Sequence, residues 1–155
     1  MTLDHEHFME MAIEEGIKGG EEGNSPVGSV IVRDGEVIAR GHNLVTSTVD
    51  VTAHAETVAL RNAGPATGAV ELPGATLYTT FEPCPMCTGA IVAARISTVV
   101  LGGRNRPAGA TYGDYTIERL IDMVGFSNRI NVVTGVLQER GETIRNDWLK
   151  QRGLA

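Results

Sequence analysis

The 155-residue sequence is short of cysteine, of aromatic residues and of basic residues. It has two cysteines, 5% aromatic residues, and 13 basic against 19 acidic side chains. No run of about 18 consecutive apolar residues occurs, so a membrane-spanning helix is not expected. The formal net charge of -6 disfavours broad attraction to phosphate backbones. These shortages argue against a membrane protein and against a nonspecific nucleic-acid-binding protein.

The amino-terminal residues lack the basic and apolar regions of a secretory signal, so we expect a cytoplasmic protein. The two cysteines are Cys84 and Cys87. In an intracellular protein, this spacing indicates metal binding or redox chemistry before a structural disulfide. The length and a hydrophobic content of 42% predict a single domain over residues 1–155.

The first 40 residues predict a helix followed by a hairpin. Apolar residues at helical spacing favour a helix over 4–18, which we expect Gly19–Gly20 to end. Two β-prone runs over 27–32 and 37–39 flank Asp34–Gly35, a dipeptide typical of a two-residue hairpin turn.

Strands and helices then alternate along the rest of the chain. We expect a loop over 41–51, a helix over 53–62 broken by Gly64 and Pro65, a strand over 75–80, a helix over 84–94, a strand over 98–101, a helix over 115–124, a strand over 131–134 and a polar helix towards Gln151. Tyr112, Tyr115 and Phe126 are expected in the core. A hairpin followed by alternating elements predicts a three-layer α/β/α fold with one central mixed sheet.

Two motifs at predicted helix starts carry zinc-binding residue types: Thr52–Glu56 (TAHAE) and Glu82–Cys87 (EPCPMC). Residues three apart on a helix are neighbours, so Cys84 and Cys87 can hold one ion together. His54 supplies a third ligand. Three protein ligands leave a fourth position for water, which is typical of catalytic zinc sites.

Glu56, two residues after His54, is the expected proton carrier. Zinc lowers the pKa of a bound water to roughly 7, so a nucleophile forms at neutral pH. A carboxylate accepts the water proton, and the resulting acid returns it to the ring nitrogen or to departing ammonia. The order His-x-Glu, then Pro-Cys-x-x-Cys, is a signature of zinc deaminases.

Three other interpretations explain less of the pattern. A structural zinc site needs a fourth protein ligand, and the sequence has no third cysteine, while His5, His7 and His42 have no matching context. A thioredoxin-like redox motif explains the cysteines but gives His54 and Glu56 no role. A non-catalytic zinc-binding module is disfavoured because Glu56 is present.

Nearly the whole chain resembles the small deaminases of the cytidine-deaminase superfamily, which include fungal-type cytosine deaminase, bacterial guanine deaminase and bacterial tRNA adenosine deaminase. The resemblance implies a zinc cofactor, a homodimer and a glutamate proton shuttle. It also implies that Asn43 contacts the bound ring. The backbone N–H of Ala55 and the carbonyl of Glu82 resemble groups that read the edge of the ring.

The features that separate these enzymes conflict. Cys87–Ile91 and Asp147–Trp148 resemble fungal-type cytosine deaminase, in which a carboxy-terminal helix covers the base. As a lone tryptophan on a polar terminal helix, Trp148 either caps a ring-binding pocket or anchors that helix. Glu82–Cys87 looks more like guanine deaminase, and Thr52–Glu56 is shared by guanine and tRNA adenosine deaminases.

A tRNA substrate is disfavoured by the acidic balance and by a tail with only Lys150 and Arg152 for phosphate contacts. The segment Arg104, Asn105 and Arg106 weakens this argument, because its two arginines are basic. The tRNA enzymes often have an acidic residue and a lysine in this loop, and Asn105 and Pro107 depart from that pattern. We therefore expect a free nucleobase, cytosine first, with guanine, an s-triazine or tRNA adenosine as alternatives.

Overall fold

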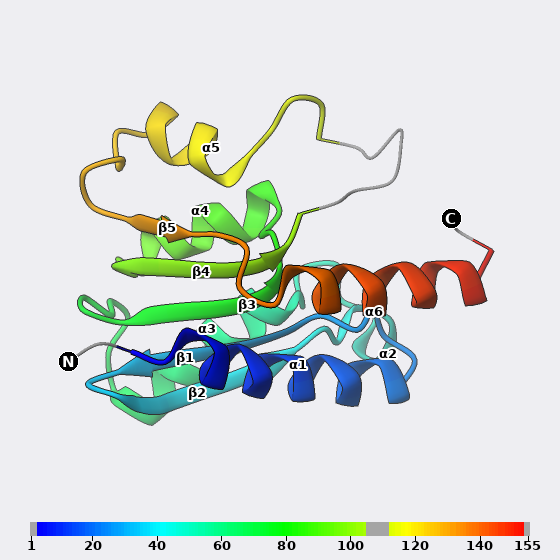
Figure 1. The fold of residues 1–155 in the computed structure, drawn as a ribbon. Coiled ribbons are helices and arrows are strands. Elements are labelled where there is room, and N and C mark those ends of the chain that lie inside the picture. Colours follow the sequence, from blue (N-terminus) through cyan, green and yellow to red (C-terminus); the bar gives the residue numbers. More distant parts are fainter. Residues whose placement is uncertain (1–2, 105–111, 154–155) are drawn as a thin grey trace.

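The computed structural model describes residues 3–104 and 112–153, in which six helices and five strands form three layers (Figure 1). The strands form one mixed sheet in the order β2-β1-β3-β4-β5. β1 (Gly28–Arg33) pairs antiparallel with β2 (Glu36–His42) and with β3 (Thr76–Phe81). β4 (Thr98–Gly103) and then β5 (Asn131–Val133) continue the sheet parallel to β3.

Helices cover both faces of this sheet (Figure 1). α1 (His5–Glu21) and α6 (Gln138–Gln151) lie on one face. α3 (Ala55–Thr67), α4 (Pro85–Ala93) and α5 (Ile117–Met123) lie on the other. The three-layer α/β/α fold indicated by the sequence is confirmed. Within the described ranges, no helix combines the length and apolar character needed to cross a membrane.

The central strands are apolar on both sides because two separate cores enclose them. Leu77 and Val99 pack into the core beneath α3, α4 and α5. The adjacent Tyr78 and Val100 pack into the core beneath α1 and α6. Since successive side chains of a strand point to opposite faces, this continuous apolar run requires helices on both sides.

The predicted hairpin is confirmed, with one extension. Asp34 and Gly35 have φ values of 54° and 77°, the left-handed pair that a type I′ turn needs. β2 continues to His42, and a short helix, α2 (Val45–Thr48), follows where a loop was expected. This extension places the end of β2 and all of α2 beside the functional site described below.

Two predicted helix breaks are wrong. α1 continues through Gly19–Gly20, where the missing side chain of Gly19 makes room for His42: a Cβ atom there would lie 3.2 Å from His42 Cδ2. α3 continues through Gly64–Pro65 and ends at Gly68, whose φ of 70° is left-handed. Pro65 is exposed and lies near the helix end, where few hydrogen bonds remain to be lost. Packing against the sheet outweighs the low helix propensity of these residues.

Gly41 allows α3 to lie directly on β2. A Cβ atom at this position would be 2.5 Å from the backbone nitrogen of Ala59 and 2.8 Å from the carbonyl oxygen of Ala55. Any side chain there would therefore displace the helix or the strand. The first turn of α3, held at this distance, begins at the functional site.

Candidate metal centre and active site

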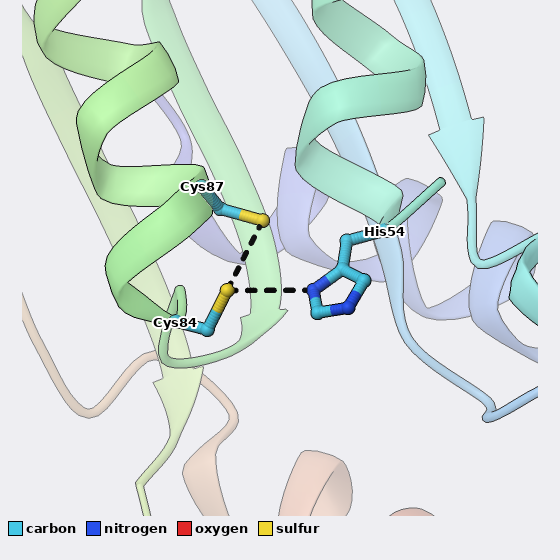
Figure 2. A group of neighbouring side chains, drawn as sticks. All are labelled: His54, Cys84 and Cys87. Carbon is cyan, nitrogen blue, oxygen red and sulfur yellow. Dashed lines mark hydrogen bonds between the residues drawn. The ribbon is translucent and has the colours of Figure 1, made fainter. Parts of the chain in front are cut away.

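His54, Cys84 and Cys87 come together where α3 and α4 begin (Figure 2). Cys84 Sγ is 3.5 Å from His54 Nδ1 and 3.6 Å from Cys87 Sγ, and all three ligand atoms lie within 4.8 Å of one another. In a tetrahedral zinc site with bonds of about 2.3 Å to sulfur and about 2.0 Å to nitrogen, ligand atoms are separated by roughly 3.5–3.8 Å. The donor set and its spacing therefore fit zinc.

Helix starts position all three side chains. His54 and Cys84 are the N-cap residues of α3 and α4, both with extended backbone, and Pro85 occupies the first turn of α4. Cys87 lies one turn further along α4. The hydrogen bond from Cys87 lowers the pKa of Cys84 to about 4, so Cys84 is a thiolate at neutral pH. The partial positive charge of the helix start favours the same form.

Glu56 lies in the first turn of α3 and is only 3% exposed. Burial raises the pKa of Glu56 to about 7, against the attraction of His54. A carboxyl group with such a pKa can both take up and release a proton near neutral pH.

A cavity of about 330 Å³ adjoins these groups. Glu56, His54 and Cys84 line it, as do all four residues expected to contact substrate, which are Asn43, Ala55, Glu82 and Trp148. The first N–H groups of α3, including that of Ala55, have no partner within the helix, and the side chain of His54 does not cap them. The cavity wall therefore combines a general acid, hydrogen-bond donors and apolar surface.

The side chain of Asn43 is oriented by its own backbone neighbours. The side-chain Oδ1 accepts a hydrogen bond from the N–H of Val45 at 3.0 Å. The backbone N–H of Asn43 donates to the carbonyl of Val27 at 3.1 Å. The bond from Val45 sets the orientation of the carboxamide, so its NH₂ group can donate to a ligand from a fixed position.

The carboxylate of Glu82 belongs to the scaffold of the site. It is buried and accepts hydrogen bonds from Arg104 Nη2 at 2.9 Å and from the N–H of Ile117 at 3.0 Å. Arg104 also donates to both carboxylate oxygens of Glu118, at 2.9 and 2.6 Å. Arg104 is thus engaged by two carboxylates. Residues 105–107, the rest of the loop considered for RNA contacts, lie outside the described residues.

Trp148 on α6 forms part of the cavity wall, and its ring is half-buried. Its Nε1 is buried without a hydrogen-bond partner among the described residues, and the guanidinium of Arg152 lies 4.3 Å above its ring. This location agrees with the pocket-capping alternative for Trp148.

Sequence reasoning missed several residues of this site. Arg145 lines the cavity and stacks on Phe81 at 4.5 Å, and its position three residues before Trp148 on one helix was the available signal. Tyr112, expected in the core, is 40% exposed and lines the cavity. Tyr115 donates to the carbonyl of Pro83 instead of serving only as core.

Comparison with known proteins identifies the family. Residues 2–103 match the family model of the cytidine and deoxycytidylate deaminase zinc-binding region. The chain belongs to this deaminase family. The expected superfamily and zinc cofactor are confirmed, with His54, Cys84 and Cys87 positioned to bind a metal. As a family member it is a hydrolase acting on carbon–nitrogen bonds.

Similar deaminases act on different substrates. The chain is 45% identical over 139 residues to the tRNA-specific adenosine deaminase of Bacillus subtilis, covering 90% of this chain and 84% of the relative. It is 44% identical over 124 residues to the guanine deaminase of the same organism, covering 77% and 78%. A solved structure from work on A-to-I editing by tRNA:A34 deaminases superposes with a TM-score of 0.75 and 38% identity, covering 89% of this chain and 98% of that one.

These relatives do not support the expectation that cytosine is the substrate. They favour two of the alternatives drawn from the sequence, tRNA adenosine and guanine. The resemblance of Cys87–Ile91 and Asp147–Trp148 to cytosine deaminase therefore has no support from these relatives. Such short segments pack against the common scaffold, whereas substrate choice depends on the whole shape of the cavity.

Proposed function

We propose that this deaminase converts an adenosine of tRNA to inosine. The observation that carries the proposal is the 45% identity to a tRNA-specific adenosine deaminase over 90% of the chain. The structural likeness to a tRNA:A34 deaminase supports it independently of any single motif. This proposal takes up the tRNA alternative in place of the free base that the sequence favoured.

The reaction replaces the amino group of the ring with oxygen from water and releases ammonia. His54, Cys84 and Cys87 would hold the zinc ion, which when bound would act as a Lewis acid and lower the pKa of a water molecule. Glu56 takes a proton from that water and delivers it to the ring nitrogen. A proton transferred through the same carboxylate then allows the carbon–nitrogen bond to break, so ammonia departs as a neutral molecule.

The remaining wall residues hold the ring against Glu56. We assign the NH₂ group of Asn43 to an acceptor on the base, and the N–H of Ala55 to the edge near the reacting carbon. The main-chain carbonyl of Glu82 accepts from the departing amino group. Trp148 covers the base from the side of α6. An enzyme of this class must take the base out of its stack, and an apolar cover favours the extruded position.

The net charge of -6 does not oppose this proposal, because two arginines lie at the cavity. Arg145 lines it, and the guanidinium of Arg152 lies over the ring of Trp148, which also lines it. Local cations decide contacts with phosphate at physiological ionic strength, since charges beyond about 8 Å are largely screened. The acidic balance considered in the sequence analysis is an average over the whole surface.

We also propose that the enzyme is a homodimer joined through α4. The exposed residues of this helix are Met86, Gly89 and Ala93, so its solvent face is apolar. Such a face on a helix of a folded domain marks an interaction surface. Ala93→Arg should convert a dimer to a monomer in light scattering, whereas Val70→Arg, at a site 87% exposed, should not. A monomeric wild-type protein would refute the proposal.

The substrate is tested directly with the zinc-loaded protein. An anticodon stem-loop RNA with adenosine at the wobble position, guanine and cytosine are supplied separately, and inosine and ammonia are measured. We expect inosine from the RNA, and no ammonia from the same RNA with uridine at that position. Glu56→Gln should abolish the reaction. The proposal would be overturned if cytosine were the only compound converted. It would equally be overturned if the RNA were not converted at all.

Guanine is the second candidate substrate. The 44% identity to a guanine deaminase over 77% of the chain favours it. The resemblance of Glu82–Cys87 to guanine deaminases, noted in the sequence, favours it too. Turnover of guanine without turnover of the stem-loop would select this candidate. The zinc ligands and Glu56 would keep the same roles, because both reactions replace an amino group on a purine carbon with oxygen.

A further inference from the structure

Asn24 follows α1 and is completely buried, although its side chain is polar. Its Oδ1 accepts hydrogen bonds from the N–H groups of Thr46 and Ser47, each at 3.0 Å. Its Nδ2 donates to Ser47 Oγ at 3.1 Å. Both the oxygen and the nitrogen of the side-chain amide thus form hydrogen bonds with α2, about twenty residues further along the chain.

α2 depends on this side chain for its helix start. It has only four residues, and Leu44 at its N-cap position makes no side-chain cap. An isolated helix of this length is unstable in water, because nucleation outweighs the few hydrogen bonds gained. Asn24 satisfies two N–H groups that would otherwise lack partners in a helix start.

The capped segment forms one wall of the cavity. Asn43, Val45 and Thr46 all line it. The N–H of Val45 fixes the carboxamide of Asn43, and the next two N–H groups are the ones that Asn24 binds. The two asparagine side chains therefore hold three consecutive N–H groups, and the backbone of residues 45–47 links the buried Asn24 to the side chain of Asn43.

We propose that Asn24 is a positioning residue that sets the substrate-binding geometry of Asn43 through α2. The inference rests on the proposed function only in that Asn43 contacts the bound ring. Asn24 itself does not line the cavity and touches neither the zinc ligands nor Glu56. Its removal should therefore weaken substrate binding while leaving the metal and the proton carrier intact.

Two substitutions separate positioning from folding. Asn24→Ala removes both cap bonds, whereas Asn24→Asp keeps an acceptor for the two N–H groups. The Ser47 hydroxyl, which accepts from Asn24 Nδ2 in the wild type, can donate to the second oxygen of the aspartate, so the buried carboxylate keeps hydrogen-bond donors. With whichever substrate the wild type converts, Asn24→Ala should raise KM roughly tenfold and leave kcat within about twofold, as expected for one misplaced hydrogen bond to the ligand. Asn24→Asp should restore KM to near the wild-type value.

Asn62→Ala serves as the control, because the side chain of Asn62 also binds the backbone of another element. Its Nδ2 donates to the carbonyl of Arg40 at 2.8 Å. Arg40 is not part of the cavity wall, so KM should not change. Zinc content should stay at the wild-type level in all variants.

Hydrogen exchange tests the same inference without any substrate. Amides of residues 45–47 should exchange faster in Asn24→Ala than in the wild type and return to slow exchange in Asn24→Asp. Amides of residues 86–90 should be unaffected. Unchanged exchange over 45–47, or an unchanged KM in Asn24→Ala, would overturn the inference. A wild-type protein inactive on the stem-loop RNA would count against the proposed function alone.

Discussion

The hydroxyl of Tyr115 donates a hydrogen bond to the carbonyl oxygen of Pro83, one residue before the zinc-binding Cys84. The same hydroxyl lies 2.7 Å from Thr88 Oγ1, one residue after Cys87. One side chain thus links the two ends of the segment that carries both cysteines. Groups that orient metal ligands in this way affect metal affinity although they do not touch the ion.

Tyr115→Phe should bind zinc roughly tenfold more weakly than the wild type, because it removes this hydroxyl and keeps the ring. Competition with a chromogenic chelator measures the difference. Tyr78→Phe is the matched control, since the Tyr78 hydroxyl bonds His5 on the opposite face of the sheet. Equal zinc affinity of the Tyr115 and Tyr78 variants would contradict the prediction.

Arg104→Met should destabilise the fold by about 2 kcal/mol, because it leaves the buried carboxylate of Glu82 without its cation. The cost stays below that of a fully buried pair because the Arg104 side chain is 26% exposed. Urea unfolding gives the free energy. Adding Glu82→Gln to this variant should recover part of the loss, and strictly additive effects would show that the pair is not coupled.

Glu56→Ala should keep the fold and the zinc and lose activity by at least about a hundredfold, as expected when a general acid–base is removed. The metal ligands are untouched by this change. Zinc content by atomic emission and turnover on the same preparation check both parts. Loss of zinc, or unimpaired turnover, would refute the role assigned to Glu56.

The protonation of His42 should make the free energy of unfolding depend on pH. Its Nδ1 is 3.0 Å from Glu15 Oε2 and its Nε2 is 2.8 Å from Glu22 Oε1, while Lys18 bonds Glu15 from the other side. Burial opposes protonation, but the two carboxylates outweigh it and raise the pKa of His42 above its ordinary value of 6.5. A raised pKa contributes stability that is complete below pH 6.5 and is lost as the pH rises through the folded-state value.

The free energy of unfolding should therefore fall above pH 6.5 in the wild type and fall less in His42→Gln. Glu15 affects the stability at acidic pH. Its burial is outweighed by hydrogen bonds from His42 and Lys18, which lower its pKa below 4.5, so its contribution is lost only as the pH falls further. Parallel curves for the two proteins above pH 6.5 would exclude His42 as the source.

Local patterns were sufficient to predict most of the elements and the metal site. Two β-prone runs around Asp34–Gly35 located the hairpin, apolar spacing and helix propensity located most helices, and the spacing of His54, Cys84 and Cys87 located the metal centre. These features depend on residues close in sequence or on ligand chemistry. The length of α1 and α3 was underestimated, because the glycines and proline that weaken them are offset by packing that no local pattern records.

The cavity wall was harder to predict because it is assembled from distant segments. Arg145 and Tyr112 reach it from parts of the chain that carry no motif. The cap that Asn24 provides to α2 joins two segments with no recognisable pairing signal. The substrate preference depends on this assembly, which explains why short resemblances pointed to cytosine while similarity along the whole chain favours a tRNA adenosine deaminase or a guanine deaminase.

The direct backbone contact between Gly41 and α3 determines how close this helix lies to the sheet at the active site. Because Ala55 and Ala59 rest on the strand with no room for a methyl group, any side chain at Gly41 would lift α3 away from the sheet. His54 and Glu56 lie at the start of that helix, and Asn43 follows the end of the same strand two residues after Gly41. The absence of one carbon atom therefore keeps the groups proposed to activate water close to Asn43, the residue proposed to hold the base.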